Sequence, residues 1–279
     1  MSIQDIKRKK TCPSCYSNNN EHFSFFRPKE NIRLRVCFDC DLIFKDTNSS
    51  NETLKVQEGE YYSSKKIGSL VDQRHLKHHK RRARNHLHYI SKYFDKDFDK
   101  SVLDIGCGAG IFLDYLKQKG WKVEGIEPDP IMHSYAVRKL GLNIKQTLFC
   151  DWAPEKEYSL VYLSHVLDDL PDLNQNINKI SKSIKKGGYL FIEVPNHSWP
   201  FRLNFEKEED LNMGHYFFSI SSLEKIIENN NFKILDITTF HLVHLNTIFQ
   251  KIISPIMVLL KLRTKKYRPY LRLIAKKGC

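Results

Sequence analysis

The chain has 279 residues, which suits one large α/β domain with a small appendage and leaves little room for two full-size domains. Hydrophobic residues make up 41% and aromatic residues 12%, so a packed core is expected and wholesale disorder is excluded. The formal charge of +13 favours an anionic partner such as a phosphate group, a nucleic acid or a membrane surface. A Lys-rich composition without any partner is the alternative explanation.

No targeting or membrane-spanning segment is expected from the sequence. The first ten residues, MSIQDIKRKK, lack the apolar core of a signal peptide, which predicts a cytoplasmic protein. The apolar stretch 252–262 is interrupted by Ser254, Pro255 and Lys261, and it is shorter than the roughly 20 residues that a membrane span needs.

Two Cys-x-x-Cys pairs lie near the N-terminus, Cys12 with Cys15 and Cys37 with Cys40. In a chain without a secretory signal, such pairs are typical of metal knuckles rather than disulfides, and their spacing predicts one tetrahedral zinc. Four thiolates fill the coordination shell, so the zinc would be structural. We expect a zinc-ribbon-like module over residues 1–46, whose apolar runs are too short for a core without metal.

Residues 47–95 are predicted to form a polar linker followed by a basic helix. Leu76, Ala83, Leu87 and Ile90 recur on one face of that helix, while Lys, Arg and His occupy the rest. The basic run would bind the pyrophosphate of a nucleotide-sugar or a nucleic acid, or it would form a solvated helix face.

Strands and helices alternate over residues 96–245, which predicts an α/β domain with a mainly parallel, doubly wound sheet covered by helices on both faces. The expected strands are 101–105, 122–127, 143–146, 158–164, 188–194 and 232–240, and the expected helices are 110–119, 130–140, 173–185 and 221–230. Residues 246–279 are expected to be a basic, amphipathic, helical tail. This tail would lie on an anionic membrane surface or dock against the sheet edge.

The first strand of this domain runs into a glycine-rich turn at Gly106, Gly108 and Gly110. Glycines let the backbone turn tightly and let a ligand approach closely beside the start of a helix. A dinucleotide site would need its third glycine at position 111, which is Ile111, so the pattern argues against NAD or FAD. Glu127 ends the next strand, where a carboxylate can accept hydrogen bonds from both hydroxyls of a ribose. An adenosine-type ligand is therefore expected.

The segments 102–110 (VLDIGCGAG) and 125–129 (GIEPD) resemble the first two motifs of the class I S-adenosylmethionine-dependent methyltransferases. Later blocks are similar to the family's in the same order: 163–172 (LSHVLDDLPD), 185–196 (KKGGYLFIEVPN) and 215–219 (HYFFS). The resemblance implies a Rossmann-like seven-stranded sheet and S-adenosyl-L-methionine as the cofactor. The cofactor-binding residues that it implies are Asp104, Gly106, Cys107, Gly108, Gly110, Glu127, Pro128, Leu148 and His165.

Within that set, the resemblance implies that the amino-acid end of the cofactor lies near Asp104, the ribose on Glu127, and the adenine near Pro128 and Leu148. For His165, a buried histidine satisfied by the backbone is the alternative to a ligand contact.

Four residues are candidates for the chemistry of methyl transfer. His215 is the first choice for a base, and either Tyr216 or Tyr62 would orient the substrate. Asp169 stands where the family commonly has the second histidine of a His-Val-Leu-Glu-His segment. The alternative role for His215 is to tether its loop over the sheet.

A cysteine module ahead of the cofactor domain resembles the sugar C-methyltransferases of deoxysugar pathways, which act on nucleotide-linked keto sugars. This chain ends at Cys279 without the additional C-terminal domain of those enzymes. The expected function is methyl transfer to a small-molecule acceptor, such as a nucleotide-linked or polysaccharide-pathway sugar. The alternatives are a nucleic-acid methyltransferase or binding module, which would lack an Asn/Asp-Pro-Pro-Tyr motif, and a catalytically inactive scaffold.

Overall fold

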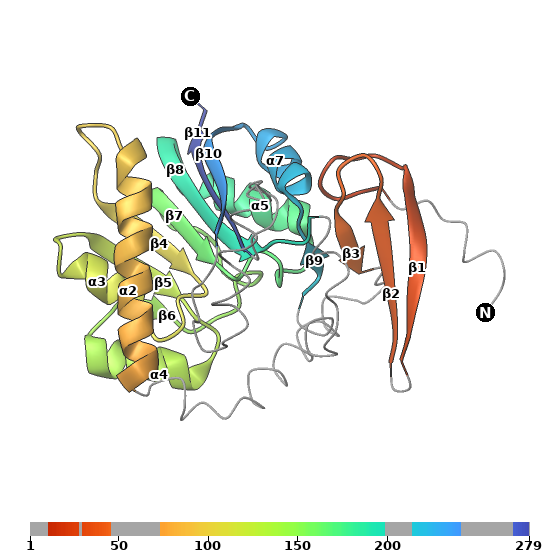
Figure 1. Cartoon of the computed structure of the whole chain (residues 1–279). Coiled ribbons are helices and arrows are strands. Elements are labelled where there is room, and N and C mark those ends of the chain that lie inside the picture. Colours follow the sequence, from red (N-terminus) through yellow and green to blue (C-terminus); the bar gives the residue numbers. More distant parts are fainter. Residues whose placement is uncertain (1–10, 28–29, 46–72, 199–213, 241–269, 279) are drawn as a thin grey trace, which may run out of the picture.

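The computed structural model describes residues 11–27, 30–45, 73–198, 214–240 and 270–278 (Figure 1). The strands are β1 (Asn20–Arg27), β2 (Glu30–Cys37), β3 (Ile43–Lys45), β4 (Ser101–Ile105), β5 (Lys122–Ile126), β6 (Ile144–Lys145), β7 (Tyr158–Ser164), β8 (Ile184–Pro195), β9 (Tyr216–Phe217), β10 (Phe232–Phe240) and β11 (Tyr270–Lys277). The helices are α2 (Gln73–Ile90), α3 (Ile111–Lys117), α4 (Pro130–Leu140), α5 (Leu173–Lys182) and α7 (Ile220–Glu228), with a 3₁₀ turn at Ser91–Tyr93.

The main sheet has seven strands in the order β10-β11-β8-β7-β4-β5-β6, which confirms the expected α/β architecture. The five strands from β8 to β6 are parallel, and β11 runs antiparallel to both of its neighbours. All five residues of β4 are buried, as the continuous apolar runs of a sheet covered on both faces require. The carboxyl ends of β4, β5 and β7 therefore meet at one edge of the sheet, where ligands of such folds bind.

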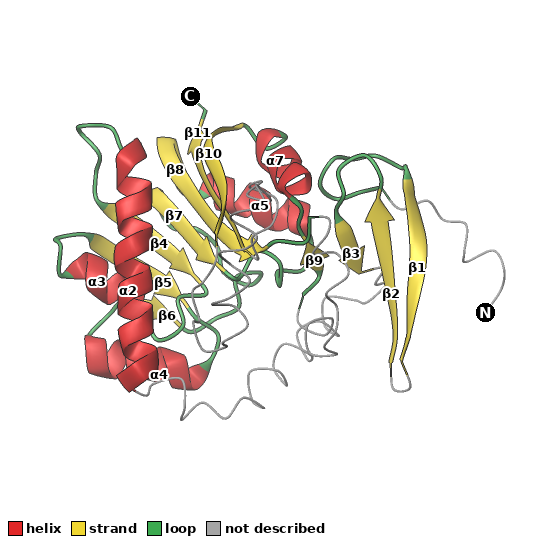
Figure 2. Cartoon of the chain, in the orientation of Figure 1, coloured by secondary structure: helices red, strands yellow, loops and turns green. Residues whose placement is uncertain are grey.

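Helices cover both faces of this sheet. Figure 2 shows α2, α3 and α4 on one side and α5 and α7 on the other. Ala83 and Ile90 of α2 share a buried cluster with Phe112 and Leu116 of α3, so α2 is part of the helical layer. Within the described part of the chain, no helix combines the length and the apolarity that crossing a membrane demands.

The expectation of a helical tail is wrong for residues 270–277, which form β11 between β8 and β10. Leu271 and Leu273 are buried, whereas Tyr270 and Arg272 are half-buried, and this alternation over residues 270–273 suits a strand. The rest of the tail lies outside the described residues, and so does the expected membrane contact.

The N-terminal module forms a second, antiparallel sheet in the order β1-β2-β3-β9. Its fourth strand, β9, belongs to the chain between β8 and α7, so the module and the main domain share a sheet. Buried residues of the module join the same core cluster as α7: Cys12, Cys37, Cys40, Leu42 and Phe44 contact a core that contains Leu223 and Ile226.

Candidate active site

The glycine turn after β4 adopts a conformation that favours glycine at all three expected positions. The φ angles are +68° at Gly106, +55° at Gly108 and +73° at Gly110. A Cβ at Gly106 would lie 2.4 Å from Cγ2 of Val166, and one at Gly110 would lie 2.5 Å from Cδ1 of Leu142. At Gly108 nothing lies within 4 Å of the Cβ position. Gly106 and Gly110 are thus demanded by packing, whereas Gly108 borders open space.

That open space belongs to a cavity of about 210 Å³ between the glycine turn and α2. Four of the expected cofactor residues line it, namely Asp104, Gly106, Cys107 and Gly108. Its other wall comes from α2, α3 and β7 and includes His79, Arg82, Phe112, Tyr162 and Ser164. The expected residues Gly110, Glu127, Pro128, Leu148 and His165 are not among those that line it.

Glu127 lies at the end of β5 and is 5% exposed. Its Oε2 accepts a hydrogen bond from the N–H of Gly108 at 2.7 Å, and its Oε1 accepts one from the N–H of Asp129 at 2.9 Å. Burial raises the pKa of Glu127 to about 7, although these two hydrogen bonds oppose the shift. Pro128 is half-buried beside it, and Leu148 is half-buried in the turn after β6.

Asp104 brings a second acidic group to the cavity. It is 3% exposed, and burial followed by repulsion from Glu127 raises its pKa well above the ordinary value, while Arg82 opposes that shift. A buried carboxylate beside an open glycine turn suits a ligand that carries both a cationic group and hydroxyl donors.

Sequence reasoning missed a buried ionic cluster around Glu193 of β8. Oε1 of Glu193 accepts a hydrogen bond from Nε of Arg82 at 3.1 Å, and Oε2 accepts two from Arg272 of β11 at 3.1 and 2.9 Å. Nε2 of His86 lies 2.8 Å from Oε2. Burial opposes ionisation of Glu193, yet His86, His165 and Arg82 hold its pKa well below the usual range. In the sequence, the feature that points to this cluster is the single carboxylate of Glu193 inside the apolar run 189–194 (YLFIEV).

This cluster continues to the end of β7. His165 has a φ of +57°, its N–H donates to the Glu193 carbonyl oxygen at 2.7 Å, and its Nε2 lies 3.4 Å from Oε1 of the same residue. Asp168 follows three residues later, and its Oδ1 is buried with no hydrogen-bond partner among the described residues. An orphaned carboxylate oxygen at this edge of the sheet is available to a donor group of a ligand.

The structure holds His215 and Tyr216 against the backbone of Asp168. The N–H groups of both residues donate to the Asp168 carbonyl oxygen, at 2.8 and 3.1 Å. Burial, with a smaller contribution from Lys45, lowers the pKa of His215 to about 4, so the imidazole is neutral at pH 7. Burial raises the pKa of Tyr216 to about 12. Asp169 is half-buried, and its N–H donates to the Val166 carbonyl oxygen at 3.0 Å.

The structure brings the four knuckle cysteines together. Their Sγ atoms all lie within 4.8 Å of one another, with Cys12 to Cys40 at 3.6 Å and Cys15 to Cys37 at 3.5 Å. A zinc ion bound by four thiolates at about 2.3 Å would put the sulfur atoms ~3.8 Å apart, so the donor set fits. The hydrogen bond with Cys40 lowers the pKa of Cys12 to about 6.

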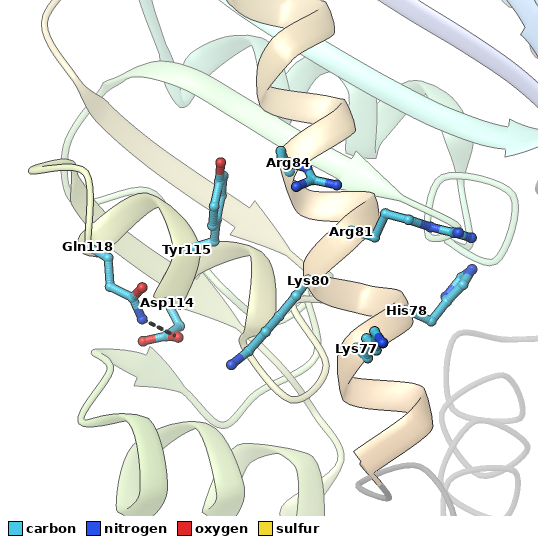
Figure 3. A pocket seen from close by; sticks show the side chains of 8 residues that line it. All are labelled: Lys77, His78, Lys80, Arg81, Arg84, Asp114, Tyr115 and Gln118. Atoms are coloured by element: carbon cyan, nitrogen blue, oxygen red, sulfur yellow. Dashed lines mark hydrogen bonds between the residues drawn. The ribbon is translucent and has the colours of Figure 1, made fainter.

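A second, larger hollow of about 540 Å³ lies between α2 and α3. In Figure 3, Lys80 extends from α2 toward Asp114 of α3, whereas Arg81 and His78 point away from α3. The lining residues are Lys77, His78, Lys80, Arg81, Arg84, Asp114, Tyr115 and Gln118. We call this the basic groove. In the described part of the chain, no ion pair involves Lys77, Lys80, Arg81 or Arg84.

Comparison with known proteins identifies the family. A family described as "Methyltransferase domain" matches residues 74–237. The ubiquinone biosynthesis O-methyltransferase of Vibrio atlanticus is 28% identical over 149 residues, which are 51% of this chain and 57% of that protein. The enzyme of the same name from Proteus mirabilis is 30% identical over 137 residues, or 46% of this chain and 56% of that protein. The chain thus spans little more than half the length of these curated relatives.

Solved structures share the fold. A SAM-dependent methyltransferase from Archaeoglobus fulgidus superposes with a TM-score of 0.54 at 24% identity, over 71% of this chain and 94% of that one. The plantazolicin methyltransferase BpumL in complex with SAH superposes with a TM-score of 0.56 at 19% identity, over 82% of this chain and 98% of that one. Because the matched region contains the glycine turn, Glu127 and the whole parallel part of the sheet, the chain belongs to the methyltransferase-domain family, with the α/β fold of the class I S-adenosylmethionine-dependent enzymes.

Proposed function

We propose that this chain transfers a methyl group from S-adenosylmethionine to a small-molecule acceptor. The observation that carries the proposal is the cavity in which the open glycine turn at Gly108, the buried carboxylate of Asp104 and the guanidinium of Arg82 meet. A carboxyl group that an approaching ammonium would ionise, together with a guanidinium, suits the zwitterionic amino-acid end of this cofactor.

Each part of the cofactor has a candidate partner. Asp104 would accept a hydrogen bond from its ammonium group, and Arg82 would bind its carboxylate. Glu127 would accept from the ribose hydroxyls, because a carboxylate that already binds two N–H groups still has lone pairs to offer. Pro128 and Leu148 would contact the adenine.

When bound, S-adenosylmethionine supplies a methyl group on a positively charged sulfur, which is electrophilic without help from a metal. The protein then has to place the acceptor in line and remove a proton where the acceptor is not already anionic. His215 is neutral at pH 7 and can take a proton, but a pKa of about 4 makes it a weak base. Orientation of the acceptor by His165, Asp168 and Tyr216 therefore contributes more than proton abstraction by His215.

Two observations bear on the class of acceptor, and they favour different small molecules. The relatives over the matched region are named for methylation of a small molecule in ubiquinone biosynthesis. The cysteine module ahead of the cofactor domain supports a nucleotide-linked or polysaccharide-pathway sugar instead. Both alternatives predict a small hydroxylated or enolisable acceptor at the edge of the sheet formed by the ends of β7 and β8.

We also propose that Cys12, Cys15, Cys37 and Cys40 hold one structural zinc ion. Three of the four cysteines are buried. Four thiolates occupy all four coordination positions of a tetrahedral zinc, so no position is left for water or substrate. Metal analysis of the purified chain should give one zinc per chain, and a content below one zinc in ten chains would refute this assignment.

The proposed function is tested with the full chain and S-adenosylhomocysteine, the demethylated product of the cofactor. Calorimetry should show one site per chain, together with a rise in Tm on saturation. Incubation with methyl-labelled S-adenosylmethionine and candidate sugar or phenolic acceptors should then transfer label. Absence of any binding at millimolar ligand would overturn the proposal.

A nucleic-acid substrate is the second candidate, and the basic groove favours it. Its Lys and Arg side chains line the same hollow as Tyr115, and Nζ of Lys119 lies 5.1 Å from the centroid of the Tyr115 ring. Single-stranded nucleic acid binds to such combinations of basic and aromatic side chains. Titration of labelled single-stranded RNA should then give an affinity that falls steeply with salt. No binding at low salt would eliminate this candidate.

A further inference from the structure

The cysteine module is tied to α7 at both ends of that helix. Oγ of Ser14, inside the first knuckle, donates to the Ser222 carbonyl oxygen at 2.5 Å, and Nδ2 of Asn229 donates to the Ser14 carbonyl oxygen at 3.0 Å. Oγ of Ser219, the N-cap of α7, donates to the carbonyl oxygen of Cys40 at 3.0 Å. Both knuckles therefore touch the helix that follows β9 directly.

The module also provides the only strand that pairs with β9 among the described residues. Phe44 pairs with Tyr216 in an antiparallel register, and the N–H of Lys45 donates to the His215 carbonyl oxygen at 3.0 Å. β9 has two residues, and a strand of this length has no stability without a partner.

On its other side, β9 contacts the edge of the main sheet at which the acceptor is expected. The N–H groups of His215 and Tyr216 share the Asp168 carbonyl oxygen, and the Tyr216 hydroxyl accepts a hydrogen bond from the N–H of Leu173 at 3.0 Å. Asp168 carries the orphaned Oδ1 described above. The N–H of Cys37 donates to the Leu42 carbonyl oxygen, directly before β3, at 2.8 Å. A path of hydrogen bonds and strand pairing therefore leads from the cysteines through β3 and β9 to Asp168 and the start of α5.

We infer that the metal-loaded cysteine module acts as a positioning device for the acceptor wall: it holds β3, β3 pairs with β9, and β9 fixes His215 and Tyr216 against Asp168. The inference rests on the proposed function and on zinc as the bound metal. The cofactor side of the site lies outside this path, because the N–H groups of Gly106 and Cys107 donate to the Ile126 carbonyl oxygen of β5 and that of Gly108 donates to Glu127. Loss of metal should thus loosen the acceptor wall and leave cofactor binding intact.

The physical reason is the small size of the module. Residues 11–45 cannot bury enough apolar surface to keep two knuckles and a hairpin in place, so metal binding contributes folding free energy. Without it, no covalent or coordinate bond would join the knuckle of Cys12 and Cys15 to that of Cys37 and Cys40, and the pairing between β3 and β9 would lose its support.

Hydrogen exchange on the full chain tests this coupling. The chain is compared as zinc-loaded protein, after chelation under reducing conditions, and after reloading with zinc, and each sample is also titrated with S-adenosylhomocysteine. Chelation should accelerate exchange at the amides of Lys45, His215 and Tyr216 by roughly tenfold or more, and reloading should reverse the change. Exchange in the glycine turn and the affinity for S-adenosylhomocysteine should each stay within about twofold of the loaded protein.

Two pairs of variants distinguish loss of the hydrogen-bond path through β3 and β9 from general destabilisation of the fold. Lys45→Pro removes the N–H that binds His215 and keeps the metal ligands, whereas Lys45→Ala keeps the N–H and serves as its control. Lys45→Pro should retain one zinc and show the fast exchange at His215 and Tyr216, and Lys45→Ala should behave as wild type. Cys15→Ser removes one ligand and should reproduce the chelated state, while Cys150→Ser, at a half-buried cysteine outside the cluster, should not.

The outcomes discriminate between the claims. Unchanged exchange at His215 and Tyr216 in the chelated protein, or in Lys45→Pro, would overturn the inference while leaving methyl transfer untouched. An equal loss of cofactor affinity on chelation would also overturn it, since the module would then support the whole fold. Failure of the zinc-loaded protein to bind S-adenosylhomocysteine would instead count against the proposed function.

Discussion

The backbone N–H of Gly108 donates a hydrogen bond to Oε2 of Glu127 at 2.7 Å, so the turn after β4 is tied to the end of β5 without any ligand. Replacement of Glu127 by Ala removes this tie and the proposed acceptor of the ribose hydroxyls. Binding of S-adenosylhomocysteine should weaken about 10- to 100-fold, since hydrogen bonds to a charged group are worth about 1.5–3 kcal/mol. Glu124→Ala on the same strand is the control in calorimetry, and equal affinities of the two variants would contradict the assignment.

Cofactor affinity should depend on pH through Glu127. Its pKa is raised from 4.5 to about 7, so the carboxyl is largely protonated at pH 6 and ionised at pH 8. Ribose hydroxyls are donors and prefer the ionised form, so affinity should rise between pH 6 and pH 8 and then level off. Glu127→Gln should flatten this rise, and a rise that persists in the variant would assign it to another group.

The same raised pKa affects the stability of the ligand-free chain, with the opposite sign. The protonated carboxyl is favoured in the folded state, so its stabilising contribution is complete below pH 4.5 and is lost as the pH rises through about 7. Urea unfolding without ligand should therefore show wild type losing stability relative to Glu127→Gln between pH 5 and pH 8. Saturation with S-adenosylhomocysteine should reduce the difference.

Alanine substitutions at two glycines of the turn should have different effects, one on the stability of the fold and the other on ligand affinity. Gly106→Ala would place a methyl group 2.4 Å from Val166 at a φ of +68°, so both strain and overlap should lower the stability of the chain. The added methyl group of Gly108→Ala meets no neighbour within 4 Å and narrows the cavity. The substitution should lower the free energy of unfolding by only ~1 kcal/mol, the cost of a left-handed backbone conformation at a residue with a Cβ. Thermal melting and ligand titration should show a large loss of Tm for the first variant and mainly a loss of affinity for the second.

Glu193 should be the most sensitive ionic position in the described structure. Glu193→Gln leaves Arg82 and Arg272 without their shared carboxylate, and breaking a buried pair in this way costs about 3–5 kcal/mol. The urea midpoint should fall accordingly, whereas Glu228→Gln at an exposed position of α7 should leave it unchanged. A small effect of Glu193→Gln would mean that water reaches the cluster.

Local patterns predicted the parts of the molecule that are local in sequence. Short segments determine the geometry of the glycine turn, of each strand or helix in the alternation, and of each knuckle through their residue types. The cluster around Glu193 could not be found in this way, because Arg82 and Arg272 come from opposite ends of the domain and meet Glu193 only once the sheet has formed. β11 was missed for a related reason, since its pairing with β8 and β10 depends on contacts distant in sequence.

The position of β11 has a consequence for how the chain is made. Synthesis proceeds from the N-terminus, so β8 and β10 leave the ribosome before the strand that separates them in the finished sheet. Until Tyr270–Lys277 emerges, both strands have an unpaired edge, and Glu193 lacks one of its two arginines. A nascent chain that stalls before Tyr270 therefore exposes strand edges of the kind on which chains aggregate.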